Sequence, residues 1–229
     1  MEKPEPKKAL VDGDILVYRF AFAAENETEA LCLVRVTDFF IEDMFEKLGV
    51  DDYQIYITGV TNFRTEVAVT QPYKGNRAKM AKPRHYKAVR NKLLEMGAIE
   101  TVNEEADDAI AIESTKERDK VWIVSIDKDF KQVPGFHYNF VKEIKEYVSD
   151  EEALLNFYTQ VLTGDRTDNI KGVEGYGPKK AEKALKDCKT AKEMWDVCVE
   201  LHGSIERATE DATLLYLRRT EGEIWQPPS

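Results

Sequence analysis

The sequence predicts an α/β fold, with a parallel central sheet flanked by helices and an all-helical C-terminal part. Three short runs rich in β-branched residues have the character of strands that are buried on both faces. Segments with apolar residues at helical spacing separate these runs, and strands alternating with helices are typical of a parallel sheet. After residue 148 only helical patterns follow. We therefore expect an α/β body over residues 1–148 and a helical part over residues 149–229.

The expected elements follow one another in a regular order. The strands are expected at residues 9–11, 53–58 and 121–126. The helices of the body are expected at residues 34–48, 86–96 and 106–115. Ser149 and Glu152 have the spacing of a capping box, which predicts a helix start at this point. The C-terminal helices are expected at residues 151–162, 178–186, 191–202 and 204–218.

The composition is that of a globular protein that works inside a cell. Of the 229 residues, 42% are hydrophobic and 33% are charged, which allows a sizeable buried core. The N-terminus lacks the apolar run of a signal peptide, and no stretch reaches the roughly 20 apolar residues of a membrane span. The three cysteines form no metal-binding pattern. We expect a cytoplasmic monomer, in the host cytoplasm if the source is a virus, with no membrane partner.

Acidic residues stand at the ends of the predicted elements. The carboxyl ends of parallel strands line one crevice, so Asp12, Asp127 and Asp129 should converge there. Taken singly, each acid has an ordinary explanation as a helix cap or a solvated loop residue. Gathered together, they would repel one another unless cations lay between them. The candidate ligands are Asp12, Glu105, Asp107, Asp108, Asp127, Asp129, Asp165 and Asp168.

An all-oxygen site of this kind selects hard cations, which here means Mg²⁺ or Mn²⁺. Two such ions about 4 Å apart can activate a water molecule and stabilise the leaving oxygen in phosphodiester hydrolysis. The acid cluster therefore predicts a two-ion hydrolase.

Positive charge is concentrated in one segment although the formal net charge is −10. Between Gln71 and Lys92 there are eight lysines and arginines and no acidic residue. A polyanion responds to the local field, so this segment is a candidate nucleic-acid contact. Beyond Arg77 the cations are equally well explained as a solvated helix face. The eight are Lys74, Arg77, Lys79, Lys82, Arg84, Lys87, Arg90 and Lys92.

Five segments between residues 9 and 186 form an ordered series: "LVDGDILVYRFAFAAE", "TNFRTEVAVTQPYKGNR", "EADD", "SIDKDFKQVPG" and "LTGDRTDNIKGVEGYGPKKA". In this order and spacing they resemble the flap endonuclease and 5′-to-3′ exonuclease family, and most closely the small exonucleases of tailed bacteriophages. The resemblance implies a PIN-like (FEN-like) fold with a helix-three-turn-helix at about residues 165–186.

The resemblance also implies roles for single residues. It places Asp12, Glu105, Asp107, Asp108 and Asp127 around a first metal ion, and Asp129, Asp165 and Asp168 around a second. It makes "YKGNR" the base of an arch over residues 71–92, where Lys74 and Arg77 reach the scissile phosphate and Asp127 completes the catalytic set. Implied contacts with duplex DNA, near a possible K⁺ ion, are Gly172, Gly175, Gly177, Lys179 and Lys180; further candidate DNA contacts in the arch are Tyr73, Arg84 and Lys87.

The sequence departs from the family at one ligand position. Related enzymes carry a carboxylate just after the second strand, where this chain has Gly59, or Val60 under a one-residue shift. Thr58 offers at most a weak oxygen ligand. Asp14, in "DGD", is expected to cap the helix that starts at Ile15 rather than to bind metal. One ligand of the first ion is therefore missing.

The predicted function is that of a metal-dependent 5′ nuclease that hydrolyses DNA at a 5′ end, flap or junction, in phage DNA replication or degradation. Two alternatives remain open. A PIN-type ribonuclease would need no duplex clamp, and the segment 172–180 argues against it. A DNA-junction binding protein that has lost catalysis has the missing carboxylate as its support.

Overall fold

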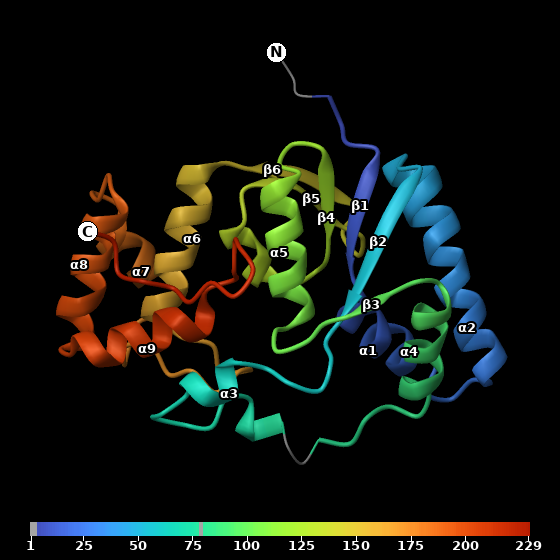
Figure 1. The fold of residues 1–229 in the computed structure, drawn as a ribbon, viewed down its shortest axis with the longest axis horizontal. Helices are drawn as coiled ribbons and strands as arrows, with labels where there is room; N and C mark the ends of the chain where they lie inside the picture. Colours follow the sequence, from blue (N-terminus) through green and yellow to red (C-terminus); the bar gives the residue numbers. More distant parts are fainter. Residues whose placement is uncertain (1–3, 78–79) are drawn as a thin grey trace.

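A computed structural model describes residues 4–77 and 80–229 of the protein. One six-stranded sheet lies at its centre, in the order β3-β2-β1-β4-β5-β6 (Figure 1). Neighbouring strands are parallel, except that β6 runs antiparallel to β5. The strands are β1 Lys8–Asp12, β2 Asp52–Ile57, β3 Ile99–Glu100, β4 Val121–Val124, β5 Gly135–Asn139 and β6 Ile144–Val148. The predicted α/β fold with a central sheet is confirmed.

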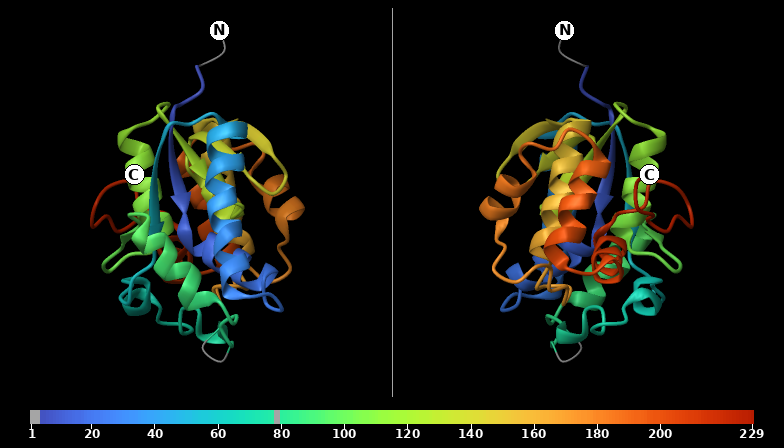
Figure 2. Two further views of the ribbon diagram at one scale, coloured as in Figure 1. Left: turned by 90° about the vertical axis from the view of Figure 1, so that its right-hand side faces the viewer. Right: turned by 90° about the vertical axis from the view of Figure 1, so that its left-hand side faces the viewer.

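Each face of the sheet is buried against its own set of helices, because successive side chains of a strand point to opposite sides. On β1, Ala9 and Val11 join the core formed with α1, α2 and α4, whereas Leu10 joins the core on the side of α5. Figure 2 shows α2 and the helical segment that continues it in front of the sheet in its left view. These helices are α1 Gly13–Ala23, α2 Glu29–Asp38, α4 Tyr86–Glu95 and α5 Ala106–Lys116, with a π-helical segment Phe39–Leu48 directly after α2.

The C-terminal helices form a separate core at the other end of the molecule (Figure 1). Phe157, Trp195 and Trp225 pack together at its centre. The short helix α3, Arg64–Val67, contacts α9 and so connects this core to the body. No helix within the described chain combines the length and the apolar character that crossing a bilayer requires. The C-terminal helices are α6 Asp150–Thr163, α7 Pro178–Leu185, α8 Ala191–His202 and α9 Ile205–Leu215.

Most of the predicted elements are present within three residues of their expected bounds, and the capping box of Ser149 with Glu152 is confirmed. The helix expected from residue 34 begins earlier, at Glu29. The sheet is parallel as expected except at β6, which pairs antiparallel with β5. That strand and β5 were not expected, because β5 carries aromatic residues and a histidine instead of a β-branched run. The boundary predicted at residue 148 falls between β6 and α6, and the division into two domains stays a prediction.

His137 on β5 should make the stability of the protein depend on pH. Its side chain is buried, and its Nε2 lies 2.7 Å from the carbonyl oxygen of Val133. Burial lowers the pKa of His137 to about 4, so the unfolded chain binds a proton more readily than the folded one does. Stability from this group is therefore present above pH 6.5 and is lost as pH falls toward 4. Urea unfolding at pH 7 and pH 5 should differ by about 2 kcal/mol on this account.

Carboxylates also titrate between pH 7 and pH 5, among them Asp12 and Asp129, whose pKa values are raised to about 7, so the His137→Gln variant is the control. Its stability loss between pH 7 and pH 5 should be smaller than that of the wild type by most of that amount. Equal losses in the two proteins would show that His137 is not the group responsible.

Candidate functional site

Acidic side chains from widely separated segments meet in one pocket of about 510 Å³. It lies at the carboxyl end of β1 and β4, where α5 begins and α6 has just ended. We call it the acidic pocket. Seven of the eight predicted ligands line it, and Asp108 does not. The carboxylates that line it are Asp12, Asp14, Glu105, Asp107, Asp127, Asp129, Asp165 and Asp168.

Asp12 ends β1 at the inner wall of the acidic pocket and is 5% exposed. Its Oδ1 accepts a hydrogen bond from the Ile15 amide at 3.1 Å, and its Oδ2 accepts one from Ser125 Oγ at 2.7 Å. The same Ser125 hydroxyl accepts from the amide of Asp127 at 3.0 Å, which ties the ends of β1 and β4 together. Burial, with smaller effects of Asp14 and Asp127, raises the pKa of Asp12 to about 7.

Asp14 does not have the capping role that the sequence suggested. Asp12 is the residue that caps α1, because its carboxylate accepts from the Ile15 amide. Asp14 lies in the first turn of that helix and points across to the end of β2. Both of its oxygens lie near the amide of Thr58, at 3.3 and 3.2 Å. The prediction for Asp14 was therefore wrong, and its carboxylate lines the acidic pocket.

Helix α5 begins at the acidic pocket, and the three acids at its start, Glu105, Asp107 and Asp108, lie in two different environments. Glu105 and Asp107 line the pocket. Asp108 is fully buried on the other side, where its two oxygens accept hydrogen bonds from Arg64 Nη1 at 2.5 Å and Nη2 at 2.8 Å. The amides of Glu105 and Arg218 also donate to Asp108, at 3.1 and 3.2 Å. With these four donors, Asp108 has no part in the pocket.

The other wall of the acidic pocket carries Asp129, Asp165 and Asp168. Burial, followed by the charges of Asp127 and Asp165, raises the pKa of Asp129 to about 7. Gln160 Nε2 donates to Asp129 Oδ1 at 2.5 Å. Lys128, which the sequence analysis did not single out, lies 3.1 Å from Asp165 Oδ2. Carboxylates with raised pKa values are difficult to ionise together, and nearby cations relieve that cost.

Lys74 and Arg77 reach the acidic pocket from the segment 72–77, which we call the arch base. Lys74 Nζ contacts Glu105 and lies 3.8 Å from Asp168, while Arg77 Nη2 lies 2.8 Å from Asp168 Oδ1. The Tyr73 hydroxyl is placed to donate to Glu105 at 2.7 Å and to Asp168 at 2.9 Å. Tyr73 also packs against the C-terminal core, and its contact with DNA stays a prediction.

Four further hydrogen bonds hold the arch base against the segment 165–169, which we call the acid loop. The backbone amide of Lys74 donates to the Asp168 carbonyl at 3.0 Å, and Asn169 Nδ2 donates to the Pro72 carbonyl at 3.0 Å. Asn76 Nδ2 and Arg77 Nε donate to carbonyl oxygens of the acid loop at 2.7 and 2.9 Å. The predicted phosphate-binding cations and two of the predicted metal ligands thus have fixed relative positions.

The donor set of the acidic pocket suits hard divalent cations, because all of its ligating atoms are oxygens. Within residues 4–77 and 80–229, no three Asp, Glu, His or Cys side chains have the mutual arrangement of a formed metal site. Ammonium and guanidinium groups face the carboxylates at Glu105, Asp165 and Asp168. A divalent cation in the pocket would have to displace these ammonium and guanidinium groups from the carboxylates.

The glycine turn, residues 172–177, lies beside the acid loop and lines a hollow of its own. Gly172 has φ +62°, and a Cβ atom there would lie 2.3 Å from the Gly164 nitrogen, so only glycine fits. Gly175 also has a positive φ, and Gly177 precedes α7. Lys179 and Lys180 are exposed in the first turn of α7. The predicted helix-three-turn-helix elements are thus close together in space.

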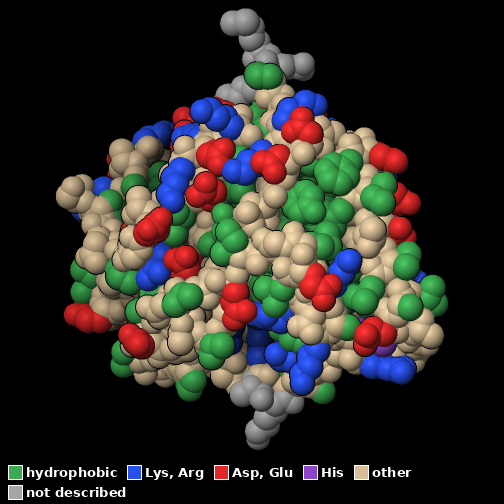
Figure 3. All heavy atoms as spheres, turned by 45° about the vertical axis from the view of Figure 1, so that its right-hand side comes forward, with side chains coloured by type: hydrophobic (Ala, Val, Ile, Leu, Met, Phe, Trp, Pro, Cys, Tyr) green, Lys and Arg blue, Asp and Glu red, His purple; other side chains and the backbone are tan. Residues whose placement is uncertain are grey.

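The other described cations of the segment 71–92 lie outside the acidic pocket. Arg84 and Lys87 are exposed near the start of α4, and Lys79 lies outside the described residues. Figure 3 shows Lys and Arg side chains gathered at the lower edge of the molecule, where the basic segment runs. Contact of Arg84 and Lys87 with DNA stays a prediction.

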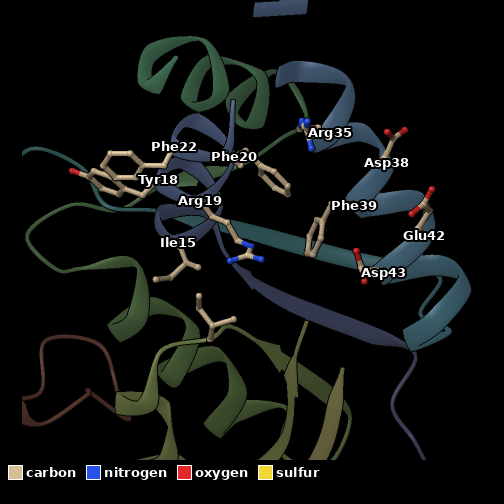
Figure 4. Close-up of a pocket in the computed structure, with 12 residues that line it drawn as sticks. Ile15, Tyr18, Arg19, Phe20, Phe22, Arg35, Asp38, Phe39, Glu42 and Asp43 are labelled. Atoms are coloured by element: carbon tan, nitrogen blue, oxygen red, sulfur yellow. The ribbon is translucent and has the colours of Figure 1, made fainter. Parts of the chain in front are cut away.

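A second hollow of about 850 Å³ adjoins the acidic pocket, with which it shares Ile15 and Tyr18. Figure 4 shows aromatic side chains of α1 on one side of it and Arg35, Asp38 and Glu42 on the other. Sequence reasoning missed Tyr18, which packs edge to face against Tyr86 with ring centroids 5.2 Å apart. Tyr18 follows Ile15 by three residues on the helix after "DGD". This spacing places the two side chains on the same face of the helix, and it could have been read from the sequence.

Comparison with known protein families gives a match over residues 7–159, to the family described as the 5′-3′ exonuclease, N-terminal resolvase-like domain. A thermostable DNA polymerase I of Thermus filiformis is 28% identical over 232 residues, which cover 93% of this chain and 26% of that protein. A 5′-3′ exonuclease of Mycoplasmopsis pulmonis is 32% identical over 104 residues, covering 40% of this chain and 35% of that protein. The chain thus spans about a quarter to a third of these curated relatives.

Solved structures have the same fold. The T5 D15 protein co-crystallised with metal ions superposes with a TM-score of 0.68 at 18% identity, covering 92% of this chain and 89% of that one. The catalytic core of Rad2 in complex with DNA substrate gives a TM-score of 0.54 at 18% identity, covering 87% of this chain and 67% of that one. At these identities the likeness concerns the fold.

Proposed function

The chain belongs to the 5′-3′ exonuclease family through its N-terminal resolvase-like domain, and on that premise we propose that it hydrolyses DNA phosphodiester bonds at or near a 5′ end. The observation that carries the proposal is the convergence of seven predicted acidic ligands on one pocket, with Lys74 and Arg77 at its edge. A phosphate would meet cations and carboxylates together there.

The proposed ions are two divalent cations, Mg²⁺ or Mn²⁺. When bound, they would supply an activated water molecule and neutralise charge on the phosphate. The first would be held by Asp12, Glu105, Asp107 and Asp127, and the second by Asp129, Asp165 and Asp168. We leave Asp108 out of the ligand set, because both of its oxygens accept hydrogen bonds from Arg64.

The arch base would bind the scissile phosphate. Lys74 and Arg77 are cations whose present partners are carboxylates of the proposed ion sites. Displaced from those carboxylates by bound divalent ions, the ammonium and guanidinium groups would be free to donate to phosphate oxygens. The hydrogen bonds to the acid loop keep them near the ions during this exchange of partners. Their part in the reaction is thus to orient the phosphate and to offset its charge.

The glycine turn and α7 would grip the DNA duplex. Small residues allow the backbone to approach phosphates, the start of α7 favours anions, and two lysines add charge. A K⁺ ion bound at the turn belongs to the same proposal. Action as a cytoplasmic monomer, in phage DNA replication or degradation, remains a prediction.

Removing the charges of Lys179 and Lys180 should weaken DNA binding without impairing the chemical step. In the double variant Lys179→Gln/Lys180→Gln, the slope of log K against log salt should fall by up to about 2, since each phosphate contact contributes about 0.9. Fluorescence anisotropy with a labelled duplex at several salt concentrations measures this slope. The matched control is Lys189→Gln, outside the turn. An unchanged slope in the double variant would contradict the duplex role of α7.

The experiment that tests the proposed function is incubation with a 5′-flap DNA duplex, with and without Mg²⁺ or Mn²⁺, followed by product sizing on a gel. We expect cleavage near the flap junction only when a divalent ion is present. A 3′-flap duplex and single-stranded RNA are the controls. Cleavage of the RNA alone would favour the ribonuclease alternative, and binding without cleavage would favour the junction-binding alternative.

A further inference from the structure

The side of the acidic pocket formed by β2 carries no carboxylate of its own. The end of this strand contributes Thr58 and Gly59 to the lining, whereas β1 and β4 lead into Asp12 and Asp127. Val60, the other position considered, is 96% exposed and lies outside the lining. The first proposed ion would therefore lack a ligand on this side unless another element supplies one.

With the present backbone, position 59 has no room for a side chain that could supply this ligand. A Cβ atom at this position would lie 2.0 Å from the carbonyl oxygen of Thr101, well inside van der Waals contact. The loop after β3 holds this place closed, since Thr101 N donates to the Ile57 carbonyl at 2.9 Å and Gly59 N donates to Thr101 Oγ1 at 3.3 Å. The absence of a side chain at Gly59 is thus part of the local packing.

Asp14 places a carboxylate at the same end of β2. Its oxygens accept from the amide of Thr58, which directly precedes Gly59, and the Thr58 side chain also hydrogen-bonds this carboxylate. A carboxylate can accept about four hydrogen bonds, so acceptor capacity beyond the two Thr58 donors remains for a cation. Thr58 Oγ1 in turn accepts from the amide of Ala106 at 2.9 Å, which fixes this corner against the start of α5.

We infer that Asp14 is a ligand of the first divalent ion and takes the place that a side chain at Gly59 cannot fill. This inference rests on the proposed function, because it concerns the same ion. Asp12, which ends β1 and caps α1, and Asp14, in the first turn of α1, would then bind together with Glu105 and Asp107 at the start of α5. The departure at Gly59 is compensated from a different element of the fold.

The test is metal binding, measured apart from catalysis. Isothermal titration with Mn²⁺ at 10 °C would compare the wild type with Asp14→Asn, which keeps an oxygen acceptor for the Thr58 amide but removes the charge. Asp12→Asn serves as the positive control. Asp51→Asn is the matched negative control, because Asp51 is exposed and lies just before β2, at the opposite end of that strand. Thermal melting of each metal-free variant reports on the fold.

We expect Asp14→Asn to raise the dissociation constant of the tighter Mn²⁺ site at least tenfold, with melting unchanged and Asp51→Asn like the wild type. Asp14→Ser, which is also neutral, should give the same loss. If both variants bind Mn²⁺ as tightly as the wild type while Asp12→Asn does not, the inference is overturned and the proposed function stands. If the wild type takes up no Mn²⁺, the proposed function and the inference fail together.

Discussion

Asp127→Asn is expected to lower the rate of DNA cleavage by a factor of roughly 10³ while DNA binding is preserved. Asp127 follows β4, lines the acidic pocket and belongs to the proposed ligand set of the first ion. Asparagine keeps the oxygen that accepts from the Asp129 amide at 2.9 Å, so the local turn should persist. The variant loses a negative charge at the point where a divalent ion would be held. Single-turnover cleavage of a 5′-flap duplex in Mg²⁺ measures the rate.

DNA affinity is measured separately, by anisotropy in EDTA. It should equal or slightly exceed that of the wild type, because the variant repels phosphate less. Asp51→Asn is again the matched control and should cleave at the wild-type rate. Turnover of the Asp127→Asn variant at the wild-type rate would contradict the assignment of this pocket as the catalytic site.

Arg64→Met is expected to lower the free energy of unfolding by about 3–5 kcal/mol, because it leaves Asp108 buried without its counter-charge. Although burial opposes it, the guanidinium of Arg64 holds the pKa of Asp108 below its usual value. Arg64 also donates to the carbonyl oxygens of Leu214 and Tyr216, both at 2.8 Å. The variant therefore loses a connection between the body and the C-terminal helices. Urea unfolding followed by circular dichroism measures the change.

A double-mutant cycle separates the ion pair from the rest of this effect. In Arg64→Met/Asp108→Leu no buried charge is left alone, so part of the lost stability should return. A loss below about 1 kcal/mol for Arg64→Met would mean that water reaches Asp108 and that the pair is not structural. Recovery in the double variant would support a structural role for Asp108 as the buried partner of Arg64, and not a role as a metal ligand.

Most of the site could be predicted from the sequence because one topological rule governs it. Parallel strands end at the same edge of a sheet, so Asp12 and Asp127 had to lie near each other once β1 and β4 were recognised. Glu105 and Asp107 could be placed at a helix start, because the helical pattern of the sequence begins directly after Glu105. The assignment of single acids to single ions remains a prediction.

The features that sequence reasoning missed depend on partners far away in the chain. Asp108 differs from Asp107 only by its direction, which is set by Arg64, 44 residues earlier. Asp14 directly precedes the predicted helix start at Ile15, as an ordinary cap would. Only the hydrogen bond from the Thr58 amide shows that its carboxylate points to the end of β2. Strands β5 and β6 pair with each other at the edge of the sheet, where aromatic and charged residues replace the β-branched pattern.

The hydrogen bonds between the arch base and the acid loop mean that the protein cannot be cut into independently working halves at residue 148. A fragment with the first half would retain Lys74 and Arg77 but lose the carbonyl oxygens that hold them. The second half would retain Asp165 and Asp168 without the opposing acids. Neither piece would hold a complete centre, so activity recovered on mixing them would report their physical reassembly. The same junction could then serve as a split-enzyme sensor of proximity between two fused partners.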